Sequence, residues 1–125
     1  MTNAINWFEI PAFDLERAFQ FYSAVLSSNV RKGTFGNDDL ILFNVPFSTG
    51  EAVGGSIVVR PDLKPNTEGT LIYLNAFGKL SDAVAKVEQA GGMVLVGEIN
   101  LGKFGFSAII VDTEGNKIGL LSNEP

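Results

Sequence analysis

The chain has 125 residues, of which 46% are hydrophobic and 18% are charged, a composition that supports a buried core and excludes a disordered protein. Nine lysines and arginines against 14 aspartates and glutamates give a net charge of −5. Nucleic acids and anionic membrane surfaces are bound through clustered basic residues. Because the few cations are scattered along the chain, we expect no nucleic-acid partner and no membrane partner.

The sequence contains neither histidine nor cysteine. This excludes Ser-His-Asp and Cys-His catalysis, thiol redox chemistry, disulfides and metal sites made of imidazole or thiolate. An all-oxygen metal site remains open to the chain. The N-terminal residues have no basic start and no apolar signal stretch, and no apolar run reaches the length of a membrane span. We therefore expect a cytoplasmic protein.

The first half of the chain changes from a strand pattern to a helical pattern and back. Residues 5–11 are predicted to form a strand that places Trp7 and Glu9 on one face. Asp14 is a good helix N-cap, and apolar residues recur at helical spacing after it, as far as Leu26. Further strands are predicted at 38–45 and 53–59, with a weaker one near 30–34.

The second half repeats this order after residues 60–69, a polar connection that contains two prolines. A predicted strand at 70–76 precedes a helical pattern from Leu80 to Ala90, which Gly91 and Gly92 end. Three more strands are predicted at 93–96, 104–111 and 117–121.

This duplication indicates an α+β fold of two tandem βαβββ modules, approximately residues 1–62 and 68–125. A module of this size buries too little surface to be secure alone. We therefore predict one domain, residues 1–125, in which the two modules share a core.

Three segments resemble the vicinal oxygen chelate superfamily, which includes glyoxalase I, bleomycin-resistance proteins and extradiol dioxygenases. Residues 8–22 are similar to its first strand and helix, residues 87–92 to the end of its second helix, and residues 111–120 to its last hairpin. The resemblance covers nearly the whole chain. It implies a curved mixed sheet, the glyoxalase/bleomycin resistance fold, and a homodimer.

Members of this superfamily usually hold one divalent metal with four side chains from the first and last strands of each half. Alignment places these positions near Trp7, Gly55, Leu71 and Gly119 or, two residues along, at Glu9, Ile57, Tyr73 and Leu121. Glu9 is the one common metal ligand among them, and a single carboxylate does not make a site. We therefore expect no metal and no cofactor, and hence neither standard glyoxalase I nor extradiol dioxygenase activity, since both need a Lewis acid.

Glu9 is the candidate catalytic residue, as a general base or substrate anchor in an apolar cleft. A carboxylate at the sheet rim or in a structural ion pair is the alternative. Trp7 and Tyr73 are candidate ligand contacts, although each could equally serve packing. The predicted ligand-binding residues are Trp7, Tyr73, Phe104, Phe106 and Leu121, and core packing is the alternative for the two phenylalanines.

Three functions remain open at this point. The first is a metal-independent, glyoxalase-like protein that binds a small organic molecule and carries out a lyase or isomerase step by proton transfer through Glu9. The second is a non-catalytic protein that sequesters its ligand, of the bleomycin-resistance type. The third is an inert dimeric domain with a collapsed cavity.

Overall fold

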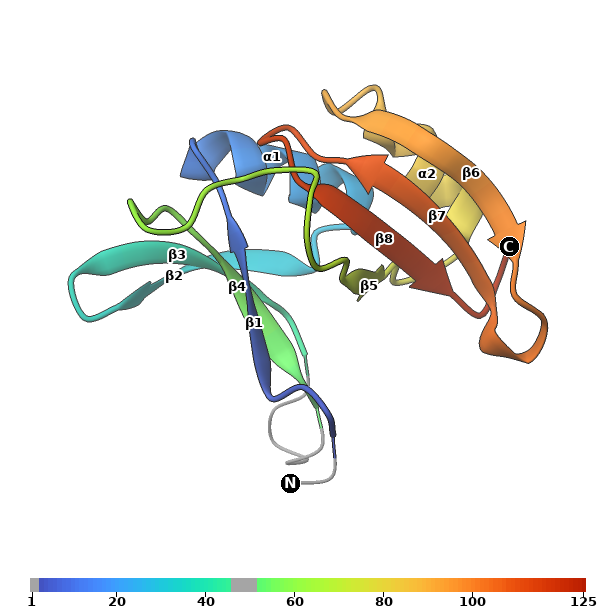
Figure 1. Cartoon of the computed structure of the whole chain (residues 1–125), viewed down its shortest axis with the longest axis horizontal. Coiled ribbons are helices and arrows are strands. Elements are labelled where there is room, and N and C mark those ends of the chain that lie inside the picture. Colours follow the sequence, from blue (N-terminus) through green and yellow to red (C-terminus); the bar gives the residue numbers. More distant parts are fainter. Residues whose placement is uncertain (1–2, 46–51) are drawn as a thin grey trace.

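A computed structural model of the chain describes residues 3–45 and 52–125, which form two βαβββ modules in succession (Figure 1). The first contains β1 (Trp7–Pro11), α1 (Leu15–Val25), β2 (Val30–Phe35), β3 (Asp38–Phe43) and β4 (Gly54–Val58). The second contains β5 (Tyr73–Asn75), α2 (Leu80–Val87), β6 (Met93–Asn100), β7 (Phe106–Val111) and β8 (Lys117–Ser122). A short 3-10 helix, Gly102–Phe104, lies between β6 and β7. The predicted α+β duplication is confirmed.

Each module forms one four-stranded mixed sheet, in the order β1-β4-β3-β2 and β5-β8-β7-β6. The first strand of each module pairs in parallel with the last, and the remaining pairs are antiparallel. β1 and β5 are therefore edge strands. No helix among the described residues has the length and apolar character needed to span a membrane.

The helices begin and end where local chemistry requires it. The Asp14 side chain caps α1 by accepting a hydrogen bond of 3.0 Å from the backbone N–H of Arg17. α1 stops before Ser27 and Ser28, which both have positive φ angles, of 53° and 62°. α2 buries Leu80, Ala83 and Val87 and ends ahead of Gly91, whose φ is 100°.

One hydrophobic cluster joins the modules. It contains residues of β1 and α1 as well as residues of β5, α2, β7 and β8. The Phe21 ring of α1 lies against Gly92, where an added Cβ would sit 2.6 Å from the ring. The two helices also pack against each other. The modules are thus held together on the helix side of both sheets.

No helix of the described residues covers the opposite side of either sheet, and we call that side the open face. In the first sheet, Ile10, Ile41 and Ile57 point into the core. Their neighbours Glu9, Leu42 and Ser56 pair across the same strands and share the open face. In the second sheet the same alternation puts Tyr73, Ser107, Gly119 and Leu121 on the open face.

Several strands differ from their predicted bounds, and β1, β5 and β6 are examples. β1 begins at Trp7 rather than at residue 5, and β5 is confined to Tyr73–Asn75. β6 continues to Asn100, beyond the predicted end at Val96. Its pairing with β7 shifts register between Val94 and Val96 and again before Ile99. These irregularities break the simple alternation from which the strand was predicted.

Candidate functional site

The open face of the first sheet is hollowed by a groove of about 420 Å³. We call it the Trp7 groove; it is lined by Trp7, Glu9, Thr34, Phe35, Leu40, Leu42 and Ser56. Trp7 pairs across the sheet with Gly54, which has no side chain to fill the space beside the indole. The result is a mostly apolar hollow with one carboxylate and two hydroxyls, a composition typical of small-molecule sites.

Glu9 is held by an arginine that follows β4. Arg60 Nη1 donates a hydrogen bond of 2.6 Å to Glu9 Oε1. Arg60 also binds Asp62 through Nε and Nη2, both at 3.2 Å from the carboxylate oxygens. The side chains of Arg60 and Glu9 are 44% and 36% exposed, so the ion pair lies at the rim of the sheet. The guanidinium lowers the pKa of Asp62 through hydrogen bonding and charge.

The second sheet carries two of the other predicted ligand contacts. The Tyr73 ring covers Gly119, its partner on β8, so closely that a Cβ at Gly119 would overlap the ring. Leu121 lies on the same open face, paired with Asn75. Tyr73 lines a different hollow, of about 460 Å³, that also contains Phe8 and Ile72. Within one chain, Tyr73 and Leu121 therefore lie apart from the Trp7 groove.

The two phenylalanines predicted as ligand contacts lie elsewhere. Phe106 is partly buried and packs against the core cluster. Its neighbour Ser107, and not Phe106, pairs with Leu121 on the open face. Phe104 lies on the 3-10 helix and is 66% exposed. Of the six predicted site residues, the structure brings Trp7 and Glu9 together in one groove, and Tyr73 and Leu121 on another face.

The predicted metal positions on β4 need correction. The open face carries Gly54 and Ser56, whereas Ile57 points into the core. Gly55 faces the Phe8 ring, which an added Cβ would approach to 2.5 Å. The sequence alignment was one residue out on this strand, which moves a side chain to the other face.

With the register corrected, the donors still do not fit a divalent metal. The equivalent positions now offer the Glu9 carboxylate beside an indole, a serine hydroxyl, a phenol and glycine. Hard divalent cations need several oxygen ligands, usually with more than one carboxylate. Within residues 3–45 and 52–125, no group of three or more acidic side chains is placed to hold a metal ion.

Sequence reasoning missed Arg60, Leu42 and Ser56 as site residues. Leu42 and Ser56 are an ordinary apolar residue and a small polar one, and only the strand register puts them beside Glu9. Arg60 follows Ser56 and Val58 at alternate positions. This spacing indicates that Arg60 lies on the same face as Ser56, and therefore as Glu9. The inference can be made only when the parallel pairing of β1 and β4 is known.

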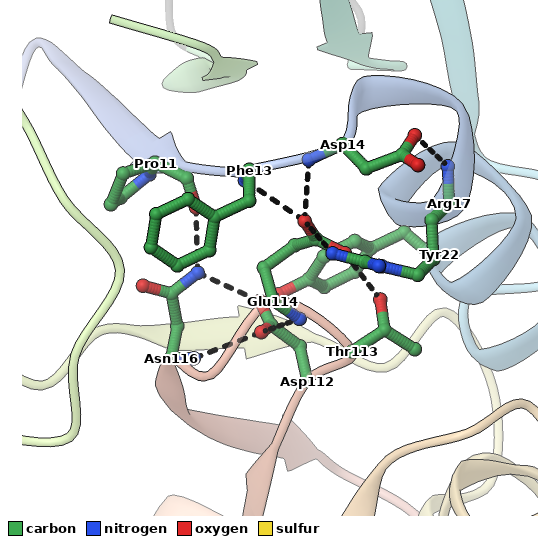
Figure 2. A network of polar contacts seen from close by, with 9 residues as sticks. All are labelled: Pro11, Phe13, Asp14, Arg17, Tyr22, Asp112, Thr113, Glu114 and Asn116. Atoms are coloured by element: carbon green, nitrogen blue, oxygen red, sulfur yellow. Dashed lines mark hydrogen bonds and ion pairs between the residues drawn. The ribbon is translucent and has the colours of Figure 1, made fainter. Parts of the chain in front are cut away.

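A second polar cluster joins the modules at the corner where β1 ends (Figure 2). In the turn before β8, Glu114 Oε1 accepts hydrogen bonds from the backbone N–H groups of Phe13 and Asp14, at 2.9 and 2.7 Å. Arg17 Nε donates to Glu114 Oε2 at 2.7 Å. Asn116 Nδ2 donates to the Pro11 carbonyl at 2.7 Å. The turn thereby fixes the corner between β1 and α1.

Asp112 completes this cluster inside the protein. The Tyr22 hydroxyl donates to Asp112 Oδ2 at 2.5 Å, and both side chains are buried. Burial, and then the Asp112 charge, raise the pKa of Tyr22 well above 10, which keeps the phenol neutral as a donor. Burial acts to raise the pKa of Glu114, but Arg17 and the backbone N–H groups outweigh it, and the pKa is lowered. The Asp112 and Glu114 carboxylates both have their hydrogen-bond donors within the protein, so we assign the cluster a structural role.

No protein-family model and no curated protein matches the sequence. Solved structures share its fold. A glyoxalase/bleomycin resistance protein from Albidiferax ferrireducens has a TM-score of 0.71 and 18% identity, over 95% of this chain and 98% of that one. A glyoxalase/bleomycin resistance protein from Streptomyces sp. CB03234 has a TM-score of 0.62 and 23% identity, over 93% of this chain and 97% of that one. The fosfomycin resistance protein FosX from Listeria monocytogenes has a TM-score of 0.64 and 13% identity, over 98% of this chain and 92% of that one.

Proposed function

We propose that this chain, which has the glyoxalase/bleomycin resistance fold of the vicinal oxygen chelate superfamily, binds a small organic molecule in the Trp7 groove without a metal ion. The observation that carries the proposal is the composition of the groove. An indole and three apolar side chains surround one carboxylate and two hydroxyls in a hollow of about 420 Å³. Such a site suits a flat apolar ligand with one polar end.

Glu9 is best suited to anchor the polar end of the ligand. A general base in an apolar cleft works through desolvation of its carboxyl group. The Glu9 side chain is instead partly exposed and already accepts a hydrogen bond from Arg60. This favours binding of the sequestering type over a lyase or isomerase step that depends on proton transfer by Glu9. A small organic molecule is thus the partner that we propose, and a cytoplasmic location stays a prediction.

A homodimer is part of the proposal, because the open face of the second sheet leaves large apolar side chains exposed. Exposed fractions range from 37% to 56% for the residues concerned, Tyr73, Met93, Val96 and Ile99. Large apolar side chains left exposed on one face of a sheet are typical of protein interfaces. A second copy of the chain is the occupant that the superfamily resemblance implies.

The test uses N-phenyl-1-naphthylamine, a neutral aromatic probe that becomes fluorescent in apolar sites. We expect saturable binding that is unchanged by EDTA. Trp7→Leu should weaken binding about tenfold, because it removes the aromatic wall of the groove. Phe13→Leu is the matched control, since Phe13 is an exposed aromatic outside the groove.

Absence of saturable binding would contradict the proposal, as would binding that requires an added divalent cation. Equal losses in Trp7→Leu and Phe13→Leu would show that the probe binds elsewhere. Product formation that is abolished by Glu9→Gln would replace the anchoring role of Glu9 with proton transfer.

A further inference from the structure

We propose that Arg60, held in place by Asp62, makes Glu9 half of a donor–acceptor pair that selects neutral ligands with an N–H group next to a carbonyl. The inference rests on the proposed function and specifies the chemistry of the ligand's polar end. It assigns Arg60, which binds the groove residue Glu9 from outside the groove lining, as a positioning and specificity-determining residue.

The backbone places Arg60 for this role. The residue follows β4 directly, and its carbonyl accepts a hydrogen bond of 3.4 Å from the N–H of Leu63 in a tight turn. The turn brings Asp62 back onto the guanidinium, which it binds with both carboxylate oxygens. Two parallel hydrogen bonds fix the plane of a guanidinium more firmly than one does. The remaining terminal nitrogen, Nη1, then points to Glu9.

The donors and acceptors that this arrangement leaves can be counted. A guanidinium has five N–H donors. Three of them are used, by two contacts to Asp62 and one to Glu9. One N–H therefore remains on Nη1 and one on Nη2. Glu9 uses Oε1 for Arg60, and its second oxygen, Oε2, has no hydrogen bond to any described residue. The Glu9–Arg60 pair thus keeps one acceptor oxygen and two N–H donors that a ligand could bind.

The charges at this rim argue against a fully charged ligand. A carboxylate on the ligand would meet Arg60 but also Glu9 and Asp62, the two acids that flank it. A cation would meet Glu9 but also the guanidinium bound to it. A neutral planar group with adjacent donor and acceptor, such as a carboxamide, a lactam or the edge of a heteroaromatic ring, satisfies both partners without placing like charges together.

Three isosteric probes separate these cases: 2-naphthamide, 2-naphthoate and 2-naphthamidine. They share one ring system and a planar end group, with charges of zero, minus one and plus one at neutral pH. Binding is followed by the emission of Trp7, the single tryptophan of the chain. We expect the amide to bind tightest to the unmodified protein, with each charged isostere weaker by about fivefold, the upper range for an exposed ion pair.

Two substitutions should change this order in opposite directions. Arg60→Gln leaves the Glu9 carboxylate alone and should make the amidine the preferred probe. Glu9→Gln leaves the guanidinium without its acidic neighbour on the groove side and should shift the preference toward the naphthoate. Lys86→Gln makes the same change in net charge as Arg60→Gln on α2, away from the groove, and should leave the order unchanged.

The inference is overturned if a charged probe binds tightest to the unmodified protein, or if Arg60→Gln and Glu9→Gln keep the original order. In either case the naphthalene ring still binds, so the proposed function stands. If none of the three probes binds, the proposed function fails and takes the inference with it. Because both side chains are partly exposed, the variants should keep the circular dichroism spectrum of the parent protein.

Discussion

Asp112 is a carboxylate that the core accepts because four donors surround it. Tyr22 supplies its hydroxyl, Asn116 its side-chain amide and backbone N–H, and Glu114 its backbone N–H. A buried charge without such partners would strongly destabilise the protein. The four donors come from the turn itself and from α1 of the other module, so a single residue links local turn geometry to the assembly of the modules.

Tyr22→Phe should lower the free energy of unfolding by about 1.5–3 kcal/mol, the usual range for a hydrogen bond to a charged group. The substitution removes the one donor to Asp112 that comes from the described part of the first module. Urea denaturation measures the loss. Tyr73→Phe is the matched control, because Tyr73 is the other tyrosine and is 48% exposed. Equal effects of the two substitutions would contradict the role given to the Tyr22 hydroxyl.

Glu114 should make the protein sensitive to acid. Its folded pKa lies below the unfolded value of about 4.3, so the folded state favours the carboxylate. The stabilisation is complete above the unfolded pKa and is lost as the pH falls through the folded pKa. Glu114→Gln should therefore be less stable than the parent at neutral pH, with a difference that shrinks below about pH 4. A difference that stays constant across this range, in urea titrations at each pH, would refute the prediction.

At the scale of elements, the glycine directly before β7 has a backbone conformation that other residues rarely adopt. Gly105 has φ of 100° and ψ of −147°, a region open almost only to glycine. An added Cβ would also overlap the carbonyl oxygen of Ser122 on β8. The beginning of β7 and the end of β8 can approach only because this position lacks a side chain.

Gly105→Ala should destabilise the protein by about 1–3 kcal/mol, from the backbone conformation alone, with the overlap adding to it. Gly97→Ala is the control within the same hairpin. A Cβ at Gly97 would meet no atom within 4 Å, and its φ is not in the left-handed region. We expect that change to stay within about 0.5 kcal/mol of the parent in thermal denaturation. Comparable losses in the two variants would show that the strain argument is wrong.

The elements that sequence reasoning found best are those with strong local signals. The cap at Asp14, the break after α1 and the stop of the second helix before Gly91 each follow from one or two residues. The extent of β6 and the face on which Gly55 lies could not be predicted from neighbouring residues, because both depend on pairing with another strand. The contacts of Asp112 and Glu114 with the first module depend on packing that no local pattern encodes.

In the candidate site, too, local patterns predicted some residues, whereas others depend on strand pairing. Trp7 and Glu9 were found because a strand pattern places them on one face, and in the structure both line the Trp7 groove. The link of Glu9 to Arg60 spans 51 positions and arises from the parallel pairing of β1 with β4. The predicted role of Phe106 rested on residue type alone, which does not separate a pocket wall from a core residue.

At the scale of the whole molecule, we expect a dimer that depends on the open face of the second sheet. Ile99→Lys puts a charge on this face, where Ile99 pairs with Ser107. Light scattering after gel filtration should show a dimer for the parent and a monomer for the variant. Ala85→Lys adds the same charge on the exposed side of α2 and should remain dimeric. A monomeric parent at all concentrations would exclude the dimer.

The two modules share one architecture but have become chemically unlike on their open faces. The first carries Glu9 and the arginine that binds it. The paired positions of the second that we have described are uncharged: Tyr73, Asn75, Ser107, Gly119 and Leu121. A duplicated fold allows such separation, because each sheet can change its outer surface while both keep their inner side in the common core.

The ring that covers Gly119 has a further consequence, for the redesign of this fold. A chelating carboxylate at position 119 would collide with the Tyr73 ring in its present position. The tyrosine would therefore have to move or be shortened before a side chain at position 119 could serve as a ligand. An engineer who wants a metal centre in this scaffold should change Tyr73 first.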